Sequence, residues 1–178
     1  HPPSPAANAR ILKSSTRTGV ETEHNVIIGG FIIDGTVNTQ VLVRAIGPSL
    51  GVLGVSNPLQ NPVLELHDAN GNTFATNDDW RESQEQEIIA TTLAPGDDHE
   101  SAIVADLAPA RYTAIVTGLG GTTGVALVEV YDLEPGNGKL ANISTRAHVG
   151  TGDDGTIAGL SIKGPQSQKN ILRADGPS

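Results

Sequence analysis

The sequence predicts an all-β protein, an antiparallel β-sandwich or jelly roll, and three observations support this prediction. Short stretches rich in Val, Ile and Thr alternate with turn residues along most of the chain, which is typical of successive short strands. Aromatic residues make up 3% of the chain, so the core must consist of Val, Ile, Leu and Ala, a composition that favours strands. Residues 82–93 (ESQEQEIIATTL) form the one tract with a helical pattern, and this tract is short.

The first half of the chain is expected to hold a proline-rich arm at residues 1–8, followed by strands. These strands are predicted at residues 10–15, 25–34, 39–46, 63–68 and 73–76. The second and third strands follow each other closely, and we expect them to pair with each other. Asn70-Gly71 separates the fourth strand from the fifth, and this dipeptide favours the tight turn of a β-hairpin.

In the second half, strands are predicted at residues 101–107, 111–117 and 125–133. The glycine-rich tract at residues 118–124 lies between the last two, and we interpret it as a hairpin loop. A phosphate-binding loop of similar composition would need a helix after it, and none is expected there. The strand pattern then restarts, with strands expected at residues 142–144, 156–163 and 169–174.

This restart is a sequence repeat. Ser15-Thr16-Arg17 recurs as Ser144-Thr145-Arg146, and Gly47-Pro48-Ser49 recurs as Gly176-Pro177-Ser178, both at a shift of 129 residues without a gap. Of the 35 positions aligned by this shift, 14 are identical, which chance would not produce. We therefore expect a proline-rich arm at residues 1–8, a β-sandwich repeat at 9–135 and a partial second repeat at 136–178.

Composition and charge exclude several classes of protein. The formal net charge is −9 and the pI is about 4.8, so the chain lacks the basic surface that binds nucleic acid. The longest strongly apolar run, residues 26–33, is far shorter than the roughly 18 residues of a membrane span. The chain has no cysteine, which excludes disulfides, zinc–thiolate sites and thiol catalysis. Methionine is absent as well, and this composition fits an extracellular or cell-surface location.

Residues 47–51 match G-x-S-x-G, the turn that presents the nucleophilic serine of many esterases. That turn needs a parallel strand before it and a helix after it, and the sequence after Ser49 is not expected to form a helix. Because the Gly-Pro-Ser part recurs at the end of the chain, we interpret it as a structural turn.

His1 could bind copper through its amine and ring, as the N-terminal histidine of copper-dependent polysaccharide monooxygenases does. The second ligand would come from the other histidines, which are His24, His67, His99 and His148. His1 begins a proline-rich arm, however, and we do not expect it to be held against the sandwich. We therefore expect the protein not to be an enzyme.

Carboxylates cluster in two predicted loops, and these clusters are the strongest candidate in the sequence for a metal site. Asp78 and Asp79 lie in one loop and Asp97 and Asp98 in another, and Ca²⁺ would offset their mutual repulsion. The alternative is acidic, solvated loops with local side-chain turns, and we favour it. Calcium is therefore the single cofactor that the sequence suggests, bound weakly if at all.

Arg44 shares its predicted strand face with Leu42 and Ile46, so its aliphatic stem is expected to be buried. A buried guanidinium needs a carboxylate partner, and we expect Glu129 or Asp132 to supply it. This pairing would give Arg44 a structural role.

Two stretches resemble a known family. Residues 63–80 (VLELHDANGNTFATNDDW) and 106–133 (DLAPARYTAIVTGLGGTTGVALVEVYDL) resemble the bacterial pre-peptidase C-terminal domain family, although Ala110 takes the place of the glycine in its G-x-Y-T strand. Residues 41–50 (VLVRAIGPSL) and 141–159 (ANISTRAHVGTGDDGTIAG) resemble uncharacterised tandem repeats in large secreted bacterial surface proteins. These resemblances imply a non-enzymatic, extracellular β-sandwich module.

We therefore predict an extracellular structural protein that binds copies of itself through its sheet edges and forms a filament by donating strands to the next subunit. The donated strands are expected to lack partners in their own chain. The residues predicted to make this contact are Thr156, Ile157, Leu160, Ile162, Ile171 and Leu172. The alternative is a module that binds carbohydrate or another surface protein. Carbohydrate modules use exposed aromatic platforms, and Trp80, Tyr112 and Tyr131 are few.

Overall fold

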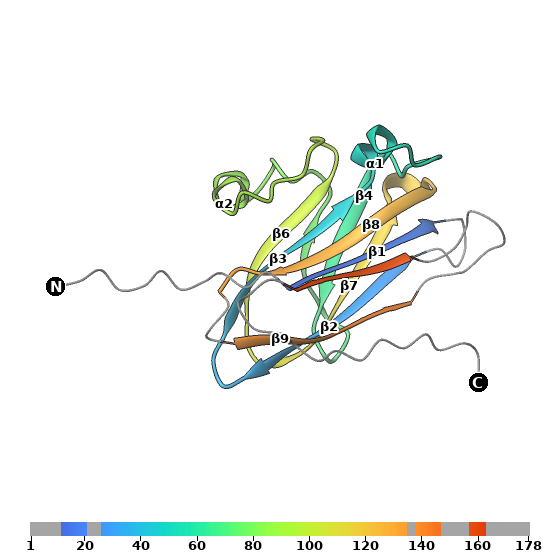
Figure 1. Ribbon diagram of the computed structural model, residues 1–178. Coiled ribbons are helices and arrows are strands. Elements are labelled where there is room, and N and C mark those ends of the chain that lie inside the picture. The colour runs from blue at the N-terminus through green and yellow to red at the C-terminus, as the bar shows by residue number, and fades with distance from the viewer. Residues whose placement is uncertain (1–11, 21–25, 135–137, 147–156, 163–178) are drawn as a thin grey trace, which may run out of the picture.

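The computed structural model describes residues 12–20, 26–134, 138–146 and 157–162, with side chains described for residues 26–134 (Figure 1). These residues form two antiparallel sheets of five strands each, packed face to face. The prediction of an all-β sandwich is therefore confirmed.

Sheet A has the strand order β10-β1-β8-β3-β6. Its strands are β10 (Ile157–Ile162), β1 (Leu12–Val20), β8 (Gly124–Asp132), β3 (Thr39–Ile46) and β6 (Ser101–Leu107). Sheet B has the order β5-β4-β7-β2-β9. Its strands are β5 (Thr73–Asn77), β4 (Pro62–His67), β7 (Ala110–Gly118), β2 (Ile27–Gly35) and β9 (Gly138–Arg146).

The core between the sheets is aliphatic, as the composition predicts. Side chains of β2 and β4 alternate between buried and half-buried positions, which is the two-residue period of a strand with one face in the core. Leu64 and Leu66 of β4 are completely buried, as are Val41 and Val43 of β3 in the opposite sheet. Phe31 is the large aromatic side chain in this layer, stacked on Tyr112 with ring centroids 5.6 Å apart.

The predicted pairing of the second and third strands is wrong. β2 lies in sheet B between β7 and β9, whereas β3 lies in sheet A between β6 and β8. The short connection between them, residues 36–38, crosses from one sheet to the other instead of forming a hairpin. By contrast, β4 and β5 form the predicted hairpin, with Gly71 at a φ of 84° in its turn.

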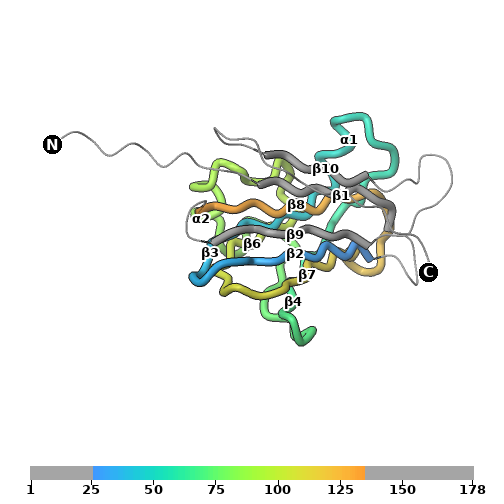
Figure 2. Tube along the Cα trace, turned by 60° about the horizontal axis from the view of Figure 1, so that its bottom comes forward, coloured from blue at the N-terminus to red at the C-terminus, as the bar shows by residue number. Residues whose placement is uncertain are grey.

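The glycine-rich tract at residues 118–124 is also a crossing and not a hairpin loop. It contains a short 3-10 helix, η1 (Leu119–Gly121), and joins β7 of sheet B to β8 of sheet A. Figure 2 shows β7 (yellow) beside β2 (blue), with β8 (orange) in the other layer. A Cβ atom on Gly118 would lie 2.0 Å from the Thr122 carbonyl oxygen, so the tight crossing requires glycine at this position.

Two short helices pack at separate places on the outer face of sheet A, and both lie in the upper part of Figure 1. α2 (Glu85–Ala90) occupies part of the predicted helical tract, and its Ile88 packs on Leu42, Trp80 and Tyr131. α1 (Pro48–Val52) corrects the expectation that no helix follows Ser49. Pro48 stands at its start, where the missing N–H costs nothing. None of the helices within the described ranges is long and apolar enough to cross a membrane.

Candidate functional site

The partial repeat contributes one strand to each sheet. β9 pairs with β2 from Gly138 opposite Gly35 to Arg146 opposite Ile28, with an irregularity after Ile32. β10 pairs with β1 along its whole length. In the described part of the chain, β9 and β10 are the end strands of sheets B and A. The expectation that the strand predicted at residues 156–163 lacks a partner in its own chain is therefore wrong.

Some of the predicted assembly residues lie on this edge. Ile157, Leu160 and Ile162 belong to β10, and Ile157 lies opposite Arg17 of β1. The other predicted assembly residues, Thr156, Ile171 and Leu172, lie outside the described residues, as does the strand predicted at residues 169–174. The first strand extends to Val20, five residues beyond its predicted end, because it pairs with β8 as well as with β10.

The acidic loops carry their own counter-charges. Arg81 donates to Asp98 with an Nε–Oδ1 distance of 2.5 Å and to Glu85 with an Nη1–Oε1 distance of 2.6 Å. The hydrogen bond to Asp98, followed by the one to Glu85, raises the pKa of Arg81. Asp79 Oδ1 lies 3.3 Å from His99 Nδ1. Arg81 was not predicted as a partner of these carboxylates, although its charge beside Asp78 and Asp79 was a usable signal.

The four predicted calcium ligands therefore have different surroundings. Asp97 caps its own loop, because its Oδ1 accepts the His99 N–H at 3.0 Å and its carbonyl accepts the Trp80 indole N–H at 3.1 Å. Asp78 is half-buried, and its carbonyl oxygen accepts a hydrogen bond from Ser101. Within residues 26–134, no three or more His, Asp or Glu side chains gather in a group that could hold a metal ion. The calcium site stays a prediction.

Glu100 is the buried centre of this region, and it was not among the carboxylates selected from the sequence. Its side chain is 0% exposed. Oε1 accepts the backbone N–H groups of Gly47 at 3.1 Å and Ser49 at 2.9 Å. Oε2 accepts the Ser49 hydroxyl at 2.9 Å and the N–H groups of Gly96 at 3.1 Å and Asp97 at 3.2 Å. One carboxylate thus ties the 47–49 turn to the 96–97 loop.

This arrangement explains the Gly-Pro-Ser motif. A Cβ atom on Gly47 would lie 2.0 Å from the Leu59 carbonyl oxygen, so this position requires glycine. The Ser49 hydroxyl donates to a carboxylate. β3, the strand before the turn, is antiparallel to both of its neighbours, unlike the strand of a nucleophile elbow. The geometry fits the structural turn that the sequence predicts.

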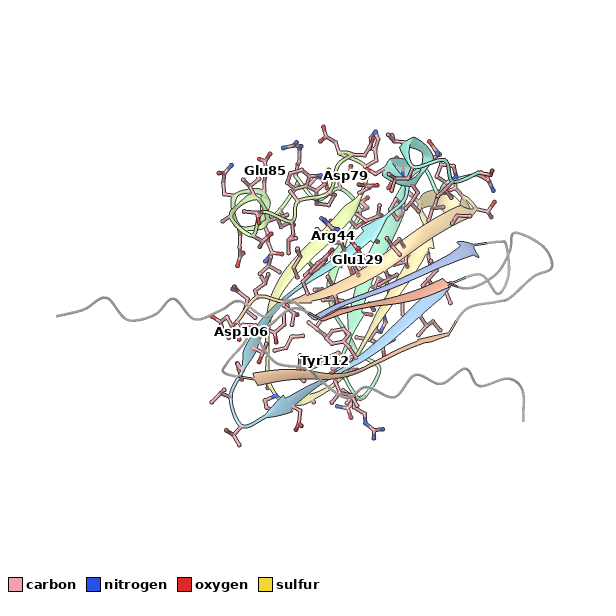
Figure 3. The ribbon with its side chains drawn as sticks, in the orientation of Figure 1. Arg44, Asp79, Glu85, Asp106, Tyr112 and Glu129 are labelled. Atoms are coloured by element: carbon pink, nitrogen blue, oxygen red, sulfur yellow. The ribbon has the colours of Figure 1, made fainter. Side chains whose placement is uncertain are left out.

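Arg44 pairs with Glu129, one of the two carboxylates predicted as its partner. Its Nε lies 2.9 Å from Glu129 Oε2, and Nη2 donates to the same oxygen. Nη2 also donates to the Tyr131 hydroxyl at 2.9 Å, and Nη1 donates to the Leu93 carbonyl at 2.5 Å. The Glu129 side chain is 1% exposed. Figure 3 shows the two side chains directed toward each other on the outer face of sheet A.

Most of the aromatic side chains are buried. Trp80 and Tyr131 are buried beneath α2, so neither offers a flat surface to a ligand. Tyr112 is half-buried, and burial, followed by the negative charge of Asp68, raises its pKa. Phe74 is 43% exposed and meets Tyr112 edge to face, with the centroids 5.9 Å apart. Phe74 is the exposed aromatic ring among residues 26–134, and the sequence analysis did not select it.

Comparison of the chain with models of known protein families finds no match, and comparison with curated protein sequences finds none. The resemblance to the bacterial pre-peptidase C-terminal domain family therefore stays a prediction.

Proposed function

We propose that this protein is a non-enzymatic structural module of an extracellular or cell-surface assembly, in which copies associate through their sheet edges. The observation that carries this proposal is the addition of β9 and β10, which repeat the opening strands, to the edges of the two sheets. An edge strand presents unpaired backbone N–H and C=O groups, which are a template for a strand of another chain.

Strand donation is the mode of association that this arrangement favours. Pro135-Gly136-Asn137 precedes β9 in the sequence, and a tract of this composition favours turns over regular structure. The same backbone pairing that β9 and β10 make within one chain could be made with β2 and β1 of a neighbour. If each chain donates its pair to the next, the contact is head to tail and generates a filament.

Deletion of residues 139–178 tests this proposal by sedimentation velocity across a range of protein concentrations. The intact chain should form concentration-dependent oligomers, and the shortened chain should lose them while retaining the strand-rich far-ultraviolet circular dichroism of a folded sandwich. Two results would contradict strand donation: an intact chain that stays monomeric at high concentration, or oligomers that the deletion leaves unchanged.

Phe74 supports a second candidate function, the binding of carbohydrate. Sugar rings stack on exposed aromatic faces, and Phe74 with the half-buried Tyr112 provides a small apolar patch at the rim of the core. In an affinity gel loaded with soluble polysaccharides, retardation that Phe74→Ala abolishes and Leu119→Ala preserves would support this function. Equal migration with and without each polysaccharide would exclude it for the sugars used.

A further inference from the structure

The two copies of the opening strands exchange partners in matching register. In the β1·β10 pair, Thr16 lies opposite Ala158. Moving each residue to its equivalent in the other copy, at the shift of 129 residues, gives Thr145 opposite Gly29. That pair is observed between β9 and β2. Thus β1 pairs with the copy of β2, and β2 pairs with the copy of β1, in the same alignment.

The same correspondence holds three residues away along the same strands. Lys13 lies opposite Ser161 in sheet A, and the equivalent pair in sheet B is Asn142 opposite Ile32. Each copy is split between the sheets, because β1 and β10 belong to sheet A and β2 and β9 belong to sheet B. β1 also faces both β2 and β9 across the sandwich. Two equivalent strand pairs related in this way form a joint with quasi-two-fold symmetry.

The pairing of β1 and β2 in the first copy predicts which strands would pair with the outer edges of β9 and β10. β1 pairs with β8 on the edge that does not meet β10, and β2 pairs with β7 on the edge that does not meet β9. Because β9 repeats β1 and β10 repeats β2, their outer edges correspond to the edges that β8 and β7 occupy in the first copy. In the described part of the chain, no further strand is paired with these outer edges.

We infer that the joint links consecutive copies of the repeat, with β8 of the next copy along β9 and β7 of the next copy along β10. Sheet B would then continue through the β8, β3 and β6 strands of that copy, and sheet A through its β7, β4 and β5 strands. Two sheets would run unbroken from one copy into the next. This inference rests on the part of the proposed function in which copies associate through sheet edges, and it assigns the partner strands. It places consecutive copies of one chain at the joint, in place of strand donation between separate chains.

The occupant is a copy that follows in the same chain, for a topological reason. In a separate molecule of this protein, β7 and β8 are already paired with that molecule's own β2 and β1. In a copy that follows β10, the strands equivalent to β1 and β2 are β9 and β10 themselves. The outer edges of β9 and β10 are then filled without displacing any strand.

Paired cysteines test the exchange in the intact chain, which has no cysteine of its own. Opposed residues of antiparallel strands have Cα atoms about 4.5–5.5 Å apart, close enough for a disulfide. Exchange predicts closure of Lys13→Cys with Ser161→Cys, and of Ile32→Cys with Asn142→Cys. If each copy instead formed its own hairpin in the same register, Lys13→Cys would close with Ile32→Cys. All three double variants would be oxidised mildly at low protein concentration and mapped by mass spectrometry of their peptides.

We expect the two exchange pairs to close within a monomer and the hairpin pair to stay reduced. The Cα–Cα distance of opposed residues alternates between a shorter and a longer value along an antiparallel pair. Thr16→Cys with Ala158→Cys therefore tests the distance that Lys13→Cys with Ser161→Cys does not, in the same two strands. Closure of the hairpin pair would overturn the inference. Exchange pairs that close only between chains would overturn it too, while supporting strand donation, so the failures of the two proposals are distinguishable.

A second experiment tests the outer edges by appending residues 50–178 after Ser178, the equivalent of Ser49. Ile32 lies opposite Arg111 in the β2·β7 pair, so Ser161 should lie opposite Arg111 of the appended copy. Ser161→Cys should therefore close with Arg111→Cys of the appended copy and not with Arg111→Cys of the first copy. Ile32→Cys with the first-copy Arg111→Cys is the positive control. Failure of the appended pair to close while this control closes would overturn the inference.

Discussion

The Ser49 hydroxyl donates a hydrogen bond of 2.9 Å to the buried carboxylate of Glu100, across 51 residues of sequence. The same carboxylate also accepts backbone N–H groups from the turn before α1 and from the 96–97 loop. Because the Glu100 carboxylate accepts several hydrogen bonds, these bonds offset the free-energy cost of burying its charge. These hydrogen bonds hold the Gly-Pro-Ser turn between β3 and α1 in one conformation.

Glu100→Gln should lower the free energy of unfolding by about 3 kcal/mol, because the new amide NH₂ would face N–H donors and leave at least one of them unsatisfied. Chemical denaturation measures this loss. Glu82→Gln, at an exposed position, is the matched control and should change stability by less than about 0.5 kcal/mol. Equal effects of the two substitutions would contradict the role given to Glu100.

Gly47→Ala should destabilise the protein by at least about 2 kcal/mol, because the added methyl group overlaps the Leu59 carbonyl oxygen. Gly29→Ala is the control, since its Cβ would meet Val128 at an ordinary 3.5 Å. Thermal unfolding of the two variants compares them directly. The account of this turn fails if Gly47→Ala is as stable as Gly29→Ala.

Arg44→Lys should cost about 2 kcal/mol of stability, and Arg44→Met about 3 kcal/mol. A lysine ammonium lacks the fork that lets Arg44 reach Glu129, Tyr131 and Leu93 together. Urea denaturation measures both variants, and Arg81→Lys, at a more exposed arginine, is the comparison. A wild-type midpoint for Arg44→Lys would show that the fork geometry contributes nothing.

Millimolar Ca²⁺ should leave the melting temperature unchanged, because Arg81 and His99 already lie against Asp98 and Asp79. A ligand that binds only the folded state raises the melting temperature by an amount that grows with the logarithm of its concentration above the dissociation constant. Differential scanning calorimetry with Ca²⁺ and with Mg²⁺ makes this comparison. A rise in melting temperature with Ca²⁺ concentration that Mg²⁺ does not reproduce and Asp98→Asn removes would overturn the prediction and establish the calcium site.

Local patterns predicted what depends on neighbouring residues. The alternation of Leu64 and Leu66 with polar residues defined β4, and Asn70-Gly71 defined its hairpin. The face shared by Arg44 and Leu42 was enough to predict a carboxylate partner, with Glu129 as one of two candidates, because a buried guanidinium has few acceptable partners.

Features that depend on distant segments could not be predicted in this way. Nothing local to β2 shows that β3 crosses to the other sheet, since both strands have one face in the same core. Glu100 follows Gly96 and two aspartates and therefore looks solvated, but some of its donors come from the 47–49 turn. The repeat was visible in the sequence, whereas the exchange of partners between its copies is a property of the fold.

The proposed association of copies through sheet edges is tested most directly by negative-stain electron microscopy of the intact protein at rising concentration. The account predicts filaments with a regular subunit spacing, because a head-to-tail contact that does not close continues indefinitely. A field of single, compact particles at every concentration would contradict it.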